Sequence, residues 1–89
     1  MTPVRSSQFK RDVRRAKARG RDTSKLRALL ELLIQRRPVP ARYRDHPLRG
    51  PWRGCREAHL ESDWLVICRV KGDELHLVRT GTHSDLFKE

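Results

Sequence analysis

The sequence predicts a small α+β fold, and three observations carry this prediction. The chain has 89 residues, too few for two compact units that each bury a core, so we expect a single domain over residues 1–89. Apolar residues recur at helical spacing before residue 38 and tend to alternate after it. Pro38-Val39-Pro40 separates the two patterns as a rigid, non-helical connector. We therefore predict an N-terminal helical hairpin packed on a small antiparallel β-sheet.

Two short amphipathic helices should form the hairpin. Ser6 or Ser7 can cap the first helix, and Gly20 ends it. Asp22 or Thr23 can cap the second helix, which closes before the proline connector. Their apolar residues recur at helical spacing, with Phe9, Val13 and Ala16 in the first helix and Leu26, Leu29, Leu30, Leu33 and Ile34 in the second.

The second half of the sequence is typical of a β-meander. Residues 52–60 and 74–80 alternate between apolar and polar side chains. Residues 64–70 form an almost continuous apolar run, which predicts a middle strand that is covered on both faces. The turns fall at residues 61–63 and 71–73, so the three strands should pair in antiparallel order.

Shorter features complete the predicted fold. A strand near Pro3–Arg5 could add an edge to the sheet, and Ser84–Phe87 could form a final helical turn that Ser84 caps. Cys55 and Cys68 show no CxxC spacing, so we expect two buried free thiols in place of a disulfide or a zinc site.

Charge is distributed unevenly along the chain. The net charge is +10 and the isoelectric point is about 11. Residues 1–44 hold 14 Lys and Arg against 3 Asp and Glu, whereas residues 45–89 hold 7 against 8. Such a basic half favours a polyanionic partner. We expect no membrane span and a cytoplasmic location, because the sequence contains no long apolar run and no apolar leader segment.

The histidines point to acid–base chemistry on RNA. RNA can be cut without a metal ion, because its 2′-hydroxyl can attack the adjacent phosphate when one group removes a proton and another protonates the leaving 5′-oxygen. Histidine suits both steps, since its pKa of roughly 6.5 lies near neutrality. All four histidines follow residue 45, outside the strongly basic half. The sequence thus predicts that histidines in the C-terminal half cut RNA and that the basic half grips it.

Three histidines lie at predicted strand ends or in loops, where side chains can converge. His46 lies in a loop, His59 near the end of the first strand, and His83 just past the last strand. Asp63, in the intervening turn, could orient or activate one imidazole. His76 lies in the middle of a strand between two leucines, so we interpret it as a solvent-facing sheet residue without a role in catalysis.

A metal-dependent mechanism fits the sequence less well. A pair of Mg²⁺ ions would need clustered carboxylates, whereas Asp45, Asp63 and Asp85 are single and scattered. A zinc site built from the three candidate histidines has no supporting local motif. We therefore expect neither a metal ion nor another cofactor.

A long ordered set of residues carries a resemblance to a known family. It runs through Asp45-His46-Pro47-Leu48, Gly50, His59, Asp63-Trp64, and Arg79-Thr80-Gly81-Thr82-His83 with Leu86-Phe87. This set resembles the YafQ branch of the RelE/ParE toxin superfamily. The helical hairpin and the proline connector are also similar, so the resemblance spans nearly the whole chain. A RelE-like fold is implied.

The resemblance implies a ribosome-dependent mRNA endonuclease, the toxin of a type II toxin–antitoxin pair. Such a toxin enters the ribosomal A site, contacts ribosomal RNA, cleaves the codon there without metal, and is held by a cognate antitoxin protein. The family's functional positions map onto residues that this chain contains. They are His46, His59, Asp63 and His83 for catalysis and Phe87 for substrate binding, and Arg79 is a further candidate as a phosphate ligand.

The implied roles are His83 as general acid, Asp63 or His46 as general base, and His59 as a positioning or charge-stabilising group. For Arg79 the plain interpretation is a strand charge, and for Phe87 it is a core residue. Two other functions stay open. One is a non-enzymatic inhibitor of DNA gyrase, as in the ParE branch, which has no use for acid–base groups. The other is a basic RNA-binding protein without catalysis.

Overall fold

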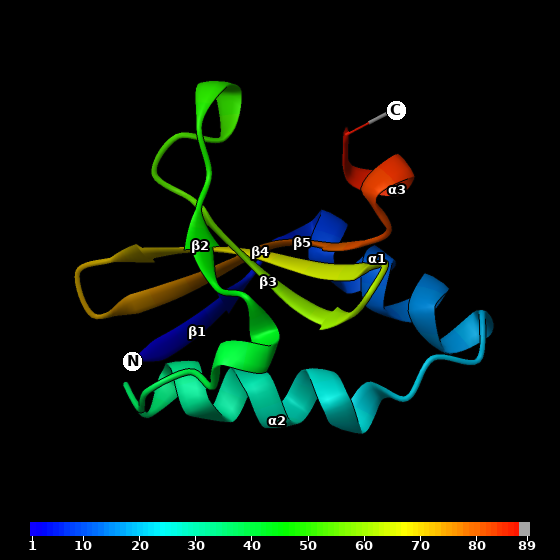
Figure 1. The fold of residues 1–89 in the computed structure, drawn as a ribbon, viewed down its shortest axis with the longest axis horizontal. Coiled ribbons are helices and arrows are strands. Elements are labelled where there is room, and N and C mark those ends of the chain that lie inside the picture. The colour runs from blue at the N-terminus through cyan, green and yellow to red at the C-terminus, as the bar shows by residue number, and fades with distance from the viewer. Residues whose placement is uncertain (88–89) are drawn as a thin grey trace.

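The computed structural model describes residues 1–87 and has three α-helices packed on a five-stranded sheet (Figure 1). This arrangement confirms the predicted α+β class. In chain order the elements are β1 (Thr2–Arg5), α1 (Ser7–Ala18), α2 (Thr23–Ile34), the 3₁₀ turn η1 (Ala41–Tyr43), β2 (His46–Pro47), the 3₁₀ turn η2 (Gly50–Trp52), β3 (Arg56–Glu61), β4 (Trp64–Lys71), β5 (Glu74–Gly81) and α3 (His83–Phe87).

The strands lie in the order β1-β5-β4-β3-β2. The predicted meander is present, because β3, β4 and β5 pair in antiparallel fashion. The predicted edge strand is also present as β1, but it runs parallel to β5, so that the sheet is mixed. A parallel pair needs a crossover connection, and the helices and the meander between β1 and β5 supply it. The short strand β2 extends the opposite edge.

Both long helices begin where the sequence indicates. The hydroxyl of Ser6 accepts a hydrogen bond from the backbone N–H of Phe9, and the carboxylate of Asp22 accepts one from Ser24. Each of these caps satisfies a backbone donor that the first helical turn leaves unpaired, which stabilises the helix by about 1 kcal/mol. Gly20, with φ +79°, reverses the chain after α1 in a conformation that residues with a side chain rarely adopt.

The starts of two predicted elements differ from those observed. The first meander strand was expected from residue 52, but it begins at Arg56 because the backbone N–H of Cys55 bonds to Trp52 in a turn that Gly54 closes at φ +90°. The last helix begins one residue early and is capped by Thr82 in place of Ser84, since the Thr82 hydroxyl accepts from Asp85 N at 3.0 Å.

The sheet buries apolar residues on both faces, and β4 contributes to each. Val66 belongs to the core under α1 and α2, together with Phe9 and Leu29, whereas Ile67 belongs to a smaller core with Leu86 of α3. Each fully buried side chain of this size stabilises the fold by about 1.5–3 kcal/mol. The middle strand is therefore covered on both sides, as its continuous apolar run predicts.

Both cysteines are buried and free, as expected. Burial raises the pKa of the Cys68 thiol to about 11, so that thiol is not reactive near neutral pH. No helix among residues 1–87 combines the length and the apolar composition that crossing a membrane requires.

Candidate active site

The candidate residues gather on the face of the sheet opposite α2. In Figure 1, the segment through β2 and η2 and the helix α3 both rise from this face, while α2 lies along the other side. His59 projects from β3 onto this face, since its partner across the ladder is Leu65 of the smaller core. His46 comes from β2 and His83 from the start of α3. Strand pairing and the final turn thus bring together residues that lie 37 positions apart in the chain.

Five aromatic rings form a row across this face. The ring centroids of His46 and His59 are 5.9 Å apart, and those of His59 and His83 are 6.1 Å apart. Phe87 continues the row 6.2 Å from His83, and Trp52 ends it with an edge-on contact to Phe87 at 5.8 Å. The three predicted histidines and Phe87 therefore share one surface, with His59 between the other two imidazoles.

Asp63 holds His83 through two hydrogen bonds. Its Oδ1 atom accepts from the backbone N of His83 at 2.9 Å and from the imidazole Nδ1 at 2.8 Å. These bonds hold the pKa of Asp63 below its ordinary value, with the backbone bond as the largest cause. Because a carboxylate can only accept, Nδ1 of His83 carries the proton, and Nε2 is the atom that can serve a substrate.

Glu57 lies between His46 and His59 and is buried. Its Oε1 atom is 2.9 Å from Nε2 of His59 and 3.8 Å from Nε2 of His46. Arg44 donates from NH2 to Nδ1 of His59 at 3.3 Å. Since the guanidinium can only donate, Nδ1 of His59 carries the lone pair and its Nε2–H donates to Glu57.

His59 is held in its neutral form. Burial lowers its pKa, and the nearby positive charge of Arg44 lowers it further, while the opposing effect of Glu57 is smaller. Its side chain is only 11% exposed, in contrast to 48% for His46 and 40% for His83. The central imidazole is thus neutral and enclosed, and the outer two are accessible to a substrate.

The position of His46 is set by its own loop. Its Nδ1 atom lies 2.7 Å from the carbonyl oxygen of Arg44, so Nδ1 donates and Nε2 carries the lone pair of the neutral ring. Arg44 adopts a left-handed conformation with φ +47°, which turns the chain into this contact. Asp45 then pairs with Arg56 at 3.0 and 3.1 Å, anchoring the loop to β3.

Arg79 is the predicted site residue whose polar contacts point elsewhere. Its Nε and NH2 atoms donate to the carboxylate of Asp12 on α1, at 2.8 and 3.2 Å. No hydrogen bond or ion pair joins Arg79 to a histidine among residues 1–87. Its observed partner therefore belongs to α1, and a contact between Arg79 and substrate stays a prediction.

Among residues 1–87, one group of side chains could hold a metal ion. Ligand atoms of His46, Glu57 and His59 all lie within 4.8 Å of one another. Two imidazoles and a carboxylate suit a transition metal such as zinc or copper. The group differs from the three-histidine zinc site considered from the sequence, because it contains Glu57 in place of His83. A metal bound here would occupy the lone pair of His46 that acid–base chemistry needs.

Comparison with known proteins identifies the family. A family model described as "Bacterial toxin of type II toxin-antitoxin system, YafQ" matches residues 1–88. The chain is 47% identical over 83 residues to the mRNA interferase toxin YafQ of Escherichia coli strain K12, a match that covers 92% of this chain and 90% of the relative. The chain belongs to the YafQ family.

Solved structures of related toxins have the same fold. The toxin in the crystal structure of the E. coli DinJ–YafQ complex matches with a TM-score of 0.89 and 45% identity over 96% of each chain. A copper-bound mutant toxin from Helicobacter pylori matches with a TM-score of 0.94 and 33% identity, over 98% of this chain and 99% of that one. The predicted fold class, the predicted YafQ family and the prediction of an mRNA interferase toxin are therefore confirmed.

Two residues of the site in this YafQ-family chain were not predicted from the sequence. Glu57 lies two positions before His59 on one strand, so its side chain shares the face of His59, and this spacing could have revealed it. Arg44 had no comparable pattern. Its contact with His59 depends on the left-handed turn before β2, which no motif in the sequence announces.

Proposed function

We propose that this chain cuts mRNA in the ribosomal A site by acid–base catalysis without a metal ion, and so stops translation in the cytoplasm. The row of His46, His59 and His83 supports this most strongly, since the tautomer of each ring is set by a fixed neighbour. A gyrase inhibitor or a plain RNA-binding protein would have no use for such a row.

His83 acts as general acid and His46 as general base in the proposed reaction. Nε2 of His46 takes the proton from the 2′-hydroxyl, whose oxygen attacks the phosphorus. The bond from phosphorus to the 5′-oxygen breaks, and the Nε2–H of the His83 imidazolium, whose Nδ1–H stays bonded to Asp63, protonates that oxygen. The products are a 2′,3′-cyclic phosphate, a 5′-hydroxyl and a neutral His83. We prefer His46 to Asp63 as the base because Asp63 already accepts two bonds from His83 and its lowered pKa makes it a weak base.

The residues between the acid and the base stabilise charge and hold the substrate. Neutral His59 lies between His46 and His83, next to the place where the phosphate would bind. Arg44, which donates to His59, brings a positive charge to that place. Phe87, next in the row, would stack against a base of the codon. Arg79 could contact a phosphate through the guanidinium atoms that Asp12 does not use.

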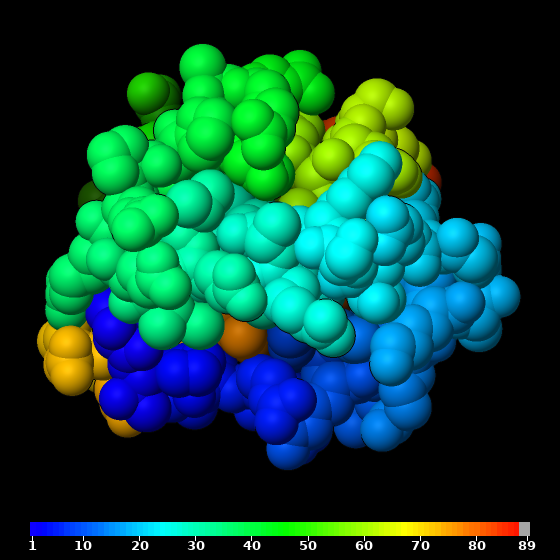
Figure 2. Space-filling model, turned by 90° about the horizontal axis from the view of Figure 1, so that it is seen from below, coloured from blue at the N-terminus to red at the C-terminus, as the bar shows by residue number. Residues whose placement is uncertain are grey.

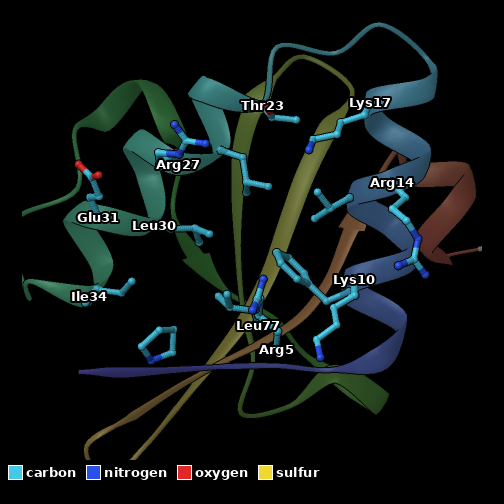
Figure 3. Close-up of a pocket in the computed structure, with 14 residues that line it drawn as sticks. Arg5, Lys10, Arg14, Lys17, Thr23, Arg27, Leu30, Glu31, Ile34 and Leu77 are labelled. Atoms are coloured by element: carbon cyan, nitrogen blue, oxygen red, sulfur yellow. The ribbon is translucent and has the colours of Figure 1, made fainter.

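The opposite face of the molecule fits an antitoxin. A groove of about 640 Å³ opens between α1 and α2, and the hollow reaches down to β5 (Figure 2). Figure 3 shows Leu30 and Ile34 of α2 directed toward the groove and Leu77 of β5 at its base. The apolar lining consists of Pro3, Phe9, Val13, Leu26, Leu30, Ile34 and Leu77.

Charged side chains surround this apolar lining. Five are cations and one is an anion, so the groove complements an acidic amphipathic segment. The toxin of the E. coli complex is bound to DinJ. We infer that the cognate antitoxin of this chain places such a segment in the groove. The charged residues are Arg5, Lys10, Arg14, Lys17, Arg27 and Glu31.

Cleavage on purified ribosomes tests the proposed function. Ribosomes carrying a defined mRNA, with one codon in the A site, are incubated with the purified chain, and the ends of the RNA fragments are mapped. We expect a cut inside the A-site codon with a 2′,3′-cyclic phosphate end, and no cut in the same mRNA without ribosomes. Inhibition of gyrase supercoiling without a cut would favour the ParE-like alternative, and RNA binding without a cut would favour the third function.

A further inference from the structure

The strand β1 covers only the first part of the outer edge of β5, and β5 continues beyond it to Gly81. The strand β1 pairs with β5 only as far as Leu77. Beyond that point, side chains from the N-cap and the middle of α1 take the place of a strand. The hydroxyl of Ser6 donates to the carbonyl of Val78 at 2.9 Å, and Oδ2 of Asp12 accepts from the backbone N of Thr80 at 3.1 Å. Helix α1 and its cap therefore provide hydrogen-bond partners for the backbone at the end of β5, which leads to the active site.

Asp12 is the centre of this contact, and its side chain is fully buried. It accepts two hydrogen bonds from Arg79 and one each from Thr80 N, Gln8 Nε2 at 3.0 Å and Arg15 NH2 at 3.1 Å. Burial by itself would raise the pKa of Asp12, but these bonds outweigh it and hold the pKa below its ordinary value. The carboxylate thus stays charged and fixed.

Thr80 links this contact to the turn that carries Asp63. Its hydroxyl donates to the carbonyl of Leu65 at 2.7 Å and accepts from Nε1 of Trp64 at 3.0 Å. Trp64 directly follows Asp63, the residue that holds the imidazole of the proposed general acid. Asp12 therefore binds Thr80, the residue whose hydrogen bonds connect β5 to the start of β4.

A second contact ties α1 to α3 beyond the strand end. Arg19 NH1 lies 2.8 Å from Oδ2 of Asp85, and Arg15 NH2 lies 3.7 Å from the same oxygen, which also accepts from Thr82 N at 3.0 Å. Gly81 permits this close packing. A Cβ atom there would lie 3.0 Å from Asp85 Cβ and 3.3 Å from Arg15 NH2. The contacts of Asp12 and Asp85 thus fix the chain before and after His83.

We propose that Asp12 and Asp85 are positioning residues, through which α1 holds His83 against Asp63 in the geometry that cleavage needs. The proposal rests on the proposed function of His83. Helix α1 then serves two purposes, because Val13 and Arg14 line the groove while Asp12 controls the strand end behind it.

Kinetics of Asp12→Asn and Arg19→Gln test this role. In the ribosome cleavage assay, we expect Asp12→Asn to lower kcat roughly ten- to hundred-fold, since a displacement of about 1 Å has this effect, while KM stays within about two-fold. Arg19→Gln should lower kcat by a smaller factor. In both variants the backbone N–H of His83, which donates to Asp63, should exchange its hydrogen faster than in the unaltered protein.

Matched controls use a surface ion pair at the far end of the molecule. Arg36 NH2 lies 3.1 Å from Oδ1 of Asp73, and both side chains are more than half exposed. Asp73→Asn and Arg36→Gln make the same chemical changes as the test variants. They should leave kcat and the exchange of the His83 amide unchanged.

A double variant separates positioning from general stability. In a His83→Ala background, Asp12→Asn should cause no further loss of cleavage, because the residue it positions is absent. If Asp12→Asn does not fold, Arg19→Gln decides, since its side chain is 46% exposed. A folded variant with unaltered kcat, or an undiminished loss without His83, overturns the proposal. If the unaltered chain cuts no mRNA, the proposed function fails, and the exchange of the His83 amide alone tests the positioning.

Discussion

The two faces of the sheet differ in how their charged groups are used. On the face with α3, polar side chains pair with one another, as His59 does with Glu57 and His83 with Asp63. On the face with α1 and α2, cations surround an apolar groove, and no ion pair involves Lys10 or Arg14 among residues 1–87. Paired groups suit chemistry, which needs fixed geometry, whereas cations around an apolar groove suit a large charged partner.

This difference places the proposed catalysis and the proposed antitoxin contact on opposite sides of the same strands. Leu77 of β5 lies in the groove, and the same strand leads into the turn before His83. An antitoxin in the groove would leave the histidine row uncovered. Inhibition would then come from the bulk and the negative charge of the bound antitoxin, which would keep the toxin out of the ribosomal A site.

The largest expected effect concerns the site face. His83→Ala should reduce ribosome-dependent cleavage by roughly a thousand-fold, because it removes the proposed general acid. His76→Ala is the matched control, since His76 pairs with Glu74 on β5 and should leave cleavage unchanged. Single-turnover cleavage rates measure both variants, and circular dichroism checks that each folds. A folded His83→Ala variant with full activity would sink the assignment of His83.

A smaller effect is expected in the groove. Leu30→Glu puts a negative charge among apolar side chains that an acidic segment would cover, and we expect antitoxin affinity to fall roughly a hundred-fold. The value of kcat should not change, because the groove lies on the other face. Val70→Glu is the control, since Val70 is exposed on β4 outside the groove. Titration calorimetry with the purified antitoxin measures the affinity, and equal affinities for both variants would contradict the docking site.

Metal ions provide a third comparison. A metal chelator should leave cleavage unchanged, whereas added Zn²⁺ should slow it roughly ten-fold by occupying the lone pair of His46, the proposed general base. Glu57→Gln should weaken this inhibition, because it removes the third ligand. Loss of activity in the chelator, with recovery on adding metal, would show that the reaction needs a metal.

The smallest effect concerns stability in acid. Hydrogen bonds outweigh burial at Asp12, and the bond from Arg19 leads at Asp85, so that both pKa values lie below their unfolded values. The contribution of these two carboxylates to the free energy of unfolding is therefore complete above about pH 4 and is lost as the pH falls through their folded pKa values. Asp85→Asn should flatten the fall in the free energy of unfolding between about pH 4 and pH 2. Urea unfolding measures it, and an unchanged slope would show that Asp85 contributes little.

Local chemistry made much of the fold predictable. The caps at Ser6 and Asp22, the turn at Gly20 and the apolar run of β4 each act over a few residues, so the sequence displays them directly. The start of β3 was placed wrongly because alternation cannot distinguish a strand from the turn that Gly54 closes. The parallel direction of β1 depends on a partner more than 70 positions away, which no local pattern records.

The sequence by itself determined the family, the fold class and the histidines and carboxylates that are available for chemistry, because these depend on residue type and order. Tertiary structure alone decided which of them meet. It placed Glu57 and Arg44 beside His59, directed Arg79 to Asp12, and separated the groove from the histidine row. The physical reason is that burial, hydrogen-bond partners and tautomers belong to an environment built from distant parts of the chain.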